Sequence, residues 1–115
     1  MNGSYRHIQV RPVAGALGAE ISGVDASRPL EAAVIAEIRQ AFLDYLVVFL
    51  HNQRLTPQAQ LAFARQFGEP MEYPPLKGLP ECPMITQVIK LAHARVNFGG
   101  IWHSDTTYLE VPPMA

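Results

Sequence analysis

The stretch that decides the fold lies near the end of the chain and reads Gly99-Gly100-Ile101-Trp102-His103-Ser104-Asp105-Thr106-Thr107-Tyr108. Its most informative feature is the pair His103 and Asp105, because side chains at positions i and i+2 of an extended strand point to the same face. An imidazole and a carboxylate placed in this way can hold one metal ion. They are two members of the 2-His-1-carboxylate triad, which suits Fe(II) and leaves coordination positions open.

The spacing alone leaves alternatives open. Two residue types at one spacing also occur as an ordinary hydrogen-bonded surface pair. A third ligand, from His7, His51 or His93, would make a three-ligand zinc site and hence a zinc hydrolase. None of these three histidines has a spacing that favours it over a surface or loop position, so the sequence supplies no convincing third ligand.

Composition restricts the class of protein. The chain has 115 residues, 49% hydrophobic and 17% charged, with a formal net charge of −1. We expect a single globular domain over residues 1–115. The sequence has no basic patch of the kind that binds nucleic acid. Its longest apolar run, residues 46–50, is too short to span a membrane. The N-terminus lacks a secretory pattern, and the single cysteine, Cys82, fits a cytoplasmic location.

Hydrophobic periodicity predicts the secondary structure. Short alternating or apolar runs predict strands over residues 7–11, 19–22, 46–50, 83–88 and 101–109, the third of them buried on both faces. Helical spacing predicts a helix over 31–45. A second helix is expected from the capping residue Thr56 and Pro57 to about Phe67, followed by a long connection over 69–83. This order favours an α+β fold.

Three ordered blocks resemble the taurine dioxygenase and 2,4-dichlorophenoxyacetate dioxygenase family of Fe(II)- and 2-oxoglutarate-dependent oxygenases. The first block is Gly18-Ala19-Glu20-Ile21-Ser22-Gly23-Val24-Asp25 with Arg28-Pro29-Leu30. The second comprises Val47-Val48-Phe49-Leu50, Gln53, Leu55-Thr56-Pro57 and Phe67-Gly68-Glu69. The third is Trp102-His103-Ser104-Asp105-Thr106-Thr107-Tyr108 with Glu110 and Pro112-Pro113. Together they cover nearly the whole chain.

The resemblance implies a double-stranded β-helix, or jelly roll, of which this chain holds the N-terminal portion. It implies that His103 and Asp105 are the first two iron ligands, that Fe(2+) and the cosubstrate 2-oxoglutarate are required, and that a distal histidine and a 2-oxoglutarate-binding arginine lie downstream. We therefore expect a dioxygenase that hydroxylates a small organic acid and forms a homo-oligomer when full length. Residues 1–115 alone are expected to show no turnover.

The resemblance also indicates where substrate recognition differs from the taurine enzyme. Tyr73 takes the place of its sulfonate-binding histidine, Leu76 that of a substrate-facing tyrosine, and Gly99 that of a substrate-contacting asparagine. These replacements argue against taurine and leave sulfonates, sulfate esters and aryloxyalkanoates open. Tyr73 and the 98–101 loop, with Gly99 and Ile101, are expected to border the substrate pocket.

A hypothesis from another class is a small non-catalytic protein that pairs with a partner through an exposed strand edge. The coding sequence beyond Ala115 distinguishes the two. A downstream histidine followed by an arginine supports the oxygenase, whereas a stop codon directly after Ala115 supports the interaction module.

Overall fold

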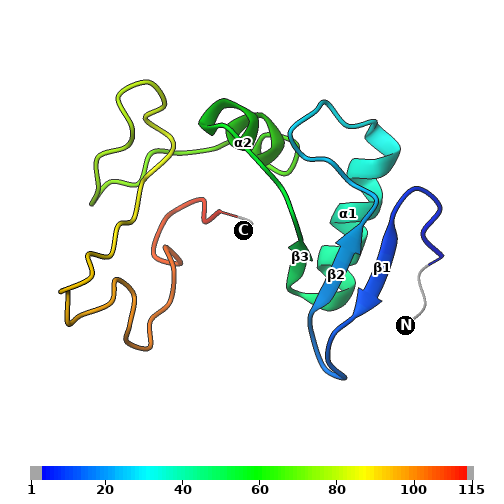
Figure 1. Cartoon of the computed structure of the whole chain (residues 1–115), viewed down its shortest axis with the longest axis horizontal. Coiled ribbons are helices and arrows are strands. Elements are labelled where there is room, and N and C mark those ends of the chain that lie inside the picture. Colours follow the sequence, from blue (N-terminus) through cyan, green and yellow to red (C-terminus); the bar gives the residue numbers. More distant parts are fainter. Residues whose placement is uncertain (1–3, 114–115) are drawn as a thin grey trace. The chain divides into compact units, whose positions relative to one another are not determined.

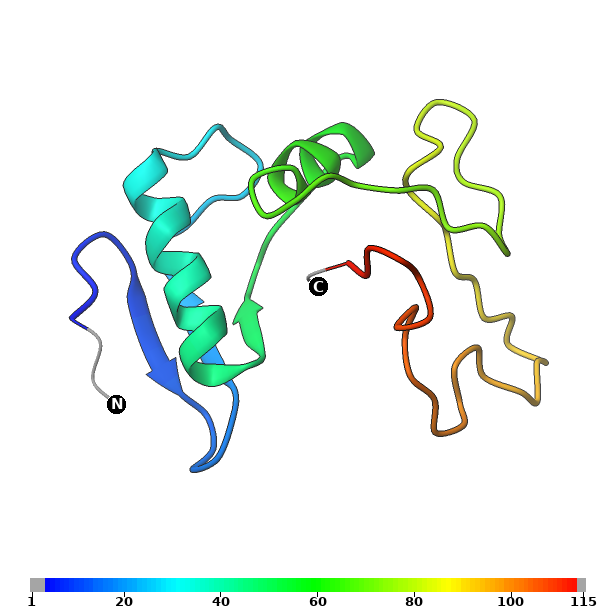
Figure 2. The same cartoon turned by 180° about the vertical axis from the view of Figure 1, so that it is seen from behind.

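The computed structural model describes residues 4–113. By its contacts the chain divides into two compact units, residues 1–67 and 68–115. The helices and strands of the described residues all lie in the first unit, drawn from blue to green in Figures 1 and 2. Each unit is described by itself.

The first unit is built on a three-stranded sheet in the order β1-β2-β3. Strands β1 (Gln9–Pro12) and β2 (Ala19–Ser22) are antiparallel, whereas β3 (Val48–Leu50) runs parallel to β2. A parallel pair needs a crossover, and helix α1 (Ala32–Tyr45) lies between β2 and β3 in the sequence and provides it (Figure 1). The segment from β2 to β3 is therefore a β-α-β unit.

One face of this sheet packs against α1, as Figure 2 shows from behind. Ile8, Ile21, Ile38 and Ala41 form the buried cluster between them, each at most 5% exposed. On α1, Ile35, Ile38 and Ala41 recur at spacings of three, which places them on one side of a helix. The predicted helix over 31–45 is confirmed to within one residue.

Helix α2 (Pro57–Ala64) begins where its capping residues predict. The Thr56 hydroxyl accepts a hydrogen bond from the Ala59 N–H at 3.2 Å, and Pro57 occupies the first turn, where its missing N–H costs nothing. The predicted end near Phe67 is too late. Short-range bonds, Gln66 N–H to Phe63 and Phe67 N–H to Ala64, replace the regular helical pattern after Ala64.

The prediction that residues 46–50 are buried on both faces is wrong for the described chain. Val48 and Leu50 are partly buried against the core, but Phe49, on the opposite face, is 45% exposed. The reason is that β3 lies at an edge of the sheet and α1 covers only one face.

The second unit contains no helix or strand between residues 68 and 113. The strands predicted over 83–88 and 101–109 are therefore wrong. A strand requires a neighbouring strand that completes its hydrogen bonds, and the β-pairing found between residues 68 and 113 is limited to an isolated bridge between Leu79 and Cys82. Cys82 is also the one buried residue among residues 68–113, so little packing opposes an irregular conformation. The jelly roll stays a prediction.

Neither of the two helices found in residues 4–113 is long and apolar enough to cross a membrane.

The segment before β1 is fastened to α1 by one carboxylate. Glu37 accepts hydrogen bonds from the backbone N–H groups of Arg6, His7 and Ile8 at 2.8–3.2 Å, and its Oε1 lies 2.9 Å from His7 Nδ1. Partial desolvation raises the pKa of Glu37, but these hydrogen bonds outweigh it and lower the pKa from 4.5 to about 2. The carboxylate form is thus favoured by folding.

This arrangement predicts an acid-dependent loss of stability. Because the folded pKa lies below the unfolded value, the stabilisation by Glu37 is complete above pH 4.5 and is lost as the pH falls towards about 2. Urea unfolding midpoints measured across this range should fall less steeply in Glu37→Gln, whose amide takes up no proton. Glu31→Gln, an exposed position at the start of the same helix, is the control. Identical pH profiles for the wild type and Glu37→Gln would contradict the assignment.

Candidate metal centre

The predicted ligands His103 and Asp105 lie together although the strand that was expected to carry them is absent. The Nε2 atom of His103 is 3.2 Å from Oδ1 of Asp105. Both side chains face solvent, with 47% and 88% of their surface exposed. The backbone over residues 102–105 is neither helical nor turned, so the two side chains can converge without a strand pairing.

The second ring nitrogen of His103 has a partner of its own. Its Nδ1 atom lies 2.6 Å from the backbone carbonyl oxygen of Ile101. A histidine that binds a metal through one nitrogen usually donates from the other to a carboxylate or a backbone carbonyl, which orients the ring. The contact is made by the main chain of Ile101, a residue that the resemblance places at the border of the substrate pocket.

The donor set fits part of an iron site. Imidazole and carboxylate ligands lie about 2.1 Å from first-row divalent ions, so two neighbouring ligands at roughly a right angle are about 3 Å apart. The observed 3.2 Å is compatible with this separation. Within residues 4–113, no group of three His, Cys, Asp or Glu side chains is placed so that it could hold one metal ion. The zinc-site alternative, which needs a third histidine from this chain, therefore gains no support from the described residues.

An open hollow of about 660 Å³ adjoins His103. It is lined by residues 99–103, and so brings the predicted substrate-side residues Gly99 and Ile101 to the same surface as His103. Tyr73, the third predicted substrate contact, is not among these residues. Its carbonyl accepts a hydrogen bond from the Leu76 N–H at 3.1 Å in a turn of the long connection. The substrate-binding roles of Tyr73, Gly99 and Ile101 stay predictions.

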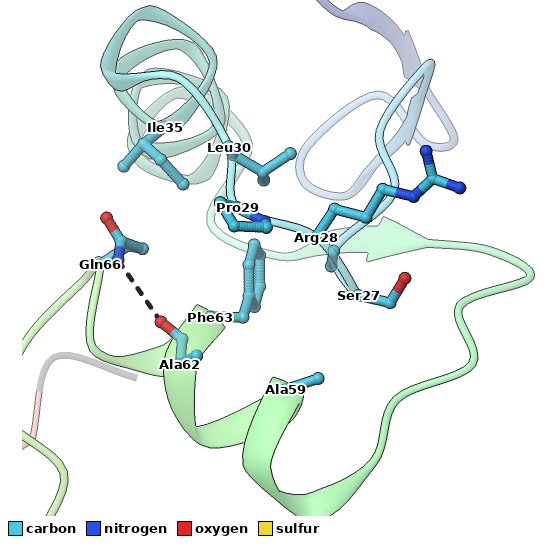
Figure 3. A pocket seen from close by; sticks show the side chains of 10 residues that line it. Ser27, Arg28, Pro29, Leu30, Ile35, Ala59, Ala62, Phe63 and Gln66 are labelled. Atoms are coloured by element: carbon cyan, nitrogen blue, oxygen red, sulfur yellow. Dashed lines mark hydrogen bonds between the residues drawn. The ribbon is translucent and has the colours of Figure 1, made fainter.

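A second cavity lies within the first unit and was not anticipated from the sequence. Figure 3 shows Phe63 of α2 directed towards Pro29, with Ala59 and Ala62 on the same helix. The cavity has a volume of about 270 Å³, and its walls are mainly apolar. Arg28, at its margin, is paired with Asp25 at 3.0 Å. The cavity lacks metal-ligating side chains and is not a counterpart of the predicted site.

Comparisons with known proteins identify the family of this chain. Residues 9–115 match the model of the family described as taurine catabolism dioxygenase TauD, TfdA. The chain is 36% identical over 109 residues to an alpha-ketoglutarate-dependent sulfate ester dioxygenase from Pseudomonas putida, covering 94% of this chain and 35% of that protein. It is 31% identical over 109 residues to an alkylsulfatase from Acinetobacter baylyi, covering 94% and 33% respectively.

The structural comparison points to the same group. A taurine dioxygenase from Burkholderia xenovorans superimposes with a TM-score of 0.64 and 39% sequence identity, over 68% of this chain and 28% of that chain. The chain spans about a third of the length of the two curated relatives. Since the family match runs from β1 through the His103 and Asp105 pair, this chain belongs to the taurine catabolism dioxygenase TauD, TfdA family.

Proposed function

We propose that this chain forms the N-terminal part of an Fe(II)- and 2-oxoglutarate-dependent dioxygenase that hydroxylates a small organic acid. The observation that carries the proposal is the 3.2 Å approach of His103 Nε2 to Asp105 Oδ1 in a member of this family. The third iron ligand and the arginine for 2-oxoglutarate would come from sequence outside residues 4–113, which hold no complete ligand set.

The roles of the two ligands follow from their charge. When bound, Fe(II) together with 2-oxoglutarate and O2 supplies the oxidation of a substrate C–H bond, with succinate and CO2 as co-products. Asp105 contributes a negative charge that offsets part of the charge of the cation, and His103 contributes a neutral nitrogen donor. The loop over residues 99–103 lines the hollow beside them and would orient the substrate there.

The proposed substrate class is a sulfate ester, with sulfonates and aryloxyalkanoates as the next candidates. Two relatives that align over most of this chain are named as a sulfate ester dioxygenase and an alkylsulfatase. Tyr73 and Leu76 occupy positions where the taurine enzyme is expected to have a histidine and a tyrosine, and this difference disfavours taurine. We propose that Tyr73, Gly99 and Ile101 border the bound acid.

The test is turnover by the product of the complete coding sequence. Succinate release would be measured with Fe(II), 2-oxoglutarate and a panel of alkyl sulfates, sulfonates and aryloxyalkanoates. We expect substrate-dependent succinate formation that is greatest with an alkyl sulfate and lost on chelation of the metal. Absence of turnover with every acid, or a stop codon directly after Ala115, would reject the enzyme and favour the interaction module.

We also propose a cytoplasmic location and a homo-oligomeric full-length enzyme. The first rests on the single cysteine and the second on the resemblance. Cell fractionation and light scattering of the complete product test them.

A further inference from the structure

We propose that Trp102, together with Ile101, forms the surface on which the hydrocarbon part of the substrate lies, and that Trp102 thereby determines the preferred chain length. This inference rests on the proposed function, because it concerns the alkyl sulfate that the enzyme is proposed to oxidise. It gives a role to Trp102, and it places the carbon chain rather than the acid group against residues 99–103.

The hollow beside His103 has mainly apolar side chains. Residues 99–103 line it, and two of them are glycines, so the side chains of the lining are those of Ile101, Trp102 and His103. Among these described residues, none carries a fixed charge. Ile101 is 82% exposed and Trp102 is fully exposed, so both present apolar surface to solvent. A hydrocarbon chain that covers them removes apolar area from water on both partners.

The polar side-chain groups of the lining do not suit an acid group. The two ring nitrogens of His103 already lie 2.6 Å from the Ile101 carbonyl oxygen and 3.2 Å from Oδ1 of Asp105. The indole of Trp102 adds a single uncharged donor. Anionic oxygens are usually held by Arg, Lys or several N–H groups, because charge-assisted hydrogen bonds offset the cost of removing the anion from water. The sulfate group therefore has its charged partners outside these three side chains.

The hollow also lies where carbon is needed. A C–H bond that is to be oxidised has to reach the metal, and His103 is both a proposed ligand and part of the lining. A chain that starts at the metal can continue over Ile101 and Trp102, whose indole is the largest apolar surface there. The volume of about 660 Å³ is within the range of small-molecule pockets, roughly 300–1,000 Å³.

The first measurement is binding of alkyl sulfates from ethyl to octyl by the full-length enzyme with Fe(II) and 2-oxoglutarate. Calorimetry without O2 measures affinity in the absence of turnover. We expect the affinity to rise about two- to fourfold with each methylene, as hydrocarbon leaves water. Trp102→Ala should weaken octyl sulfate about tenfold and change ethyl sulfate no more than about twofold. An unchanged dependence on chain length in this variant would overturn the proposal.

Val96 provides a matched control for exposed apolar surface. It is 82% exposed, as Ile101 is, and it belongs to the same unit, but it is not among the residues that line the hollow. Ile101→Ala should weaken octyl sulfate by about threefold or more, whereas Val96→Ala should leave the affinity unchanged. Equal losses in the two variants would show that the hollow is not where the chain binds.

The second measurement reports on the indole directly. The ¹⁹F resonance of 5-fluorotryptophan at position 102 can be assigned by its disappearance in Trp102→Phe. Octyl sulfate should shift this resonance. Inorganic sulfate, which is anionic but carries no carbon, should leave it in place. A shift caused by inorganic sulfate would put the acid group at the indole and reject the proposed orientation.

A third measurement tests whether another part of the enzyme covers the indole instead. In that case Trp102→Ala would lower the urea midpoint of the substrate-free enzyme and would weaken every alkyl sulfate by the same factor. We expect an unchanged midpoint and a loss confined to the longer chains. Trp102→Phe keeps an aromatic surface, so it should retain most of the dependence on chain length. This variant keeps the test decisive if the alanine variant fails to fold.

These results distinguish the inference from the proposed function. If succinate is released but Trp102→Ala keeps the wild-type dependence on chain length, the dioxygenase stands and the role of Trp102 falls. If no acid is turned over but octyl sulfate binds and loses affinity in Trp102→Ala, the hydrocarbon surface stands and the dioxygenase falls. A wild-type enzyme that binds octyl sulfate no more tightly than ethyl sulfate rejects the role of Trp102 directly.

Discussion

Asp105→Ala in the full-length protein is expected to lower substrate-dependent succinate release by at least about 10³-fold, or about 4 kcal/mol of transition-state stabilisation. The change removes the negative charge of the pair and leaves His103 without the group that lies 3.2 Å from its Nε2. Two neutral ligands hold a divalent cation more weakly than a set that contains a carboxylate.

The measurement is kcat/KM with saturating Fe(II) and 2-oxoglutarate, together with the metal content of the purified protein. Glu110→Ala removes an exposed carboxylate from the same segment and should leave the rate within about twofold of the wild type, as surface changes usually do. A variant at position 105 that keeps more than about a tenth of the activity would show that Asp105 is not a ligand.

Ile38→Ala is expected to destabilise the first unit by about 2–5 kcal/mol, the usual range when a buried isoleucine is reduced to alanine. Ile38 is 2% exposed and packs with Ile8, Ile21 and Ala41. The substitution would open a cavity between α1 and the sheet. Because the buried cluster has only four members, few other side chains could move to fill that cavity.

Leu43→Ala tests whether burial is the cause. Leu43 lies on the same helix but is 59% exposed, so its replacement should cost no more than about 0.5 kcal/mol. Urea unfolding followed by circular dichroism gives both values. Similar losses of stability for the two variants would show that the face of α1 that carries Ile38 does not pack against the sheet.

The sequence was most informative where local chemistry determines the structure. The helical spacing of Ile35, Ile38 and Ala41 predicts both α1 and its buried side. The hydroxyl of Thr56 and the ring of Pro57 locate the start of α2. The parallel pairing of β2 with β3 depends on contacts between segments far apart in sequence, so no local pattern reveals it.

Prediction failed where a segment depends on neighbours. Residues 83–88 and 101–109 have the composition of strands, but strand propensity mainly reflects packing against adjacent strands. Between residues 68 and 113 there is no adjacent strand with which these segments could pair. The convergence of His103 and Asp105 needs only an extended backbone over two residues. The contact with the Ile101 carbonyl could not be foreseen, because every residue carries the same main-chain carbonyl.

The buried cluster of the first unit uses residues from Ile8 to Ala41, and the aromatic side chains that pack on it end at Phe67. A nascent chain leaving the ribosome therefore contains the whole of this core before the codon for His103 is read. At about 5–20 residues per second, the interval is roughly a few seconds, far longer than a helix or a small sheet takes to form. Vectorial synthesis thus completes the sequence of the core of the first unit before the metal-binding segment is made.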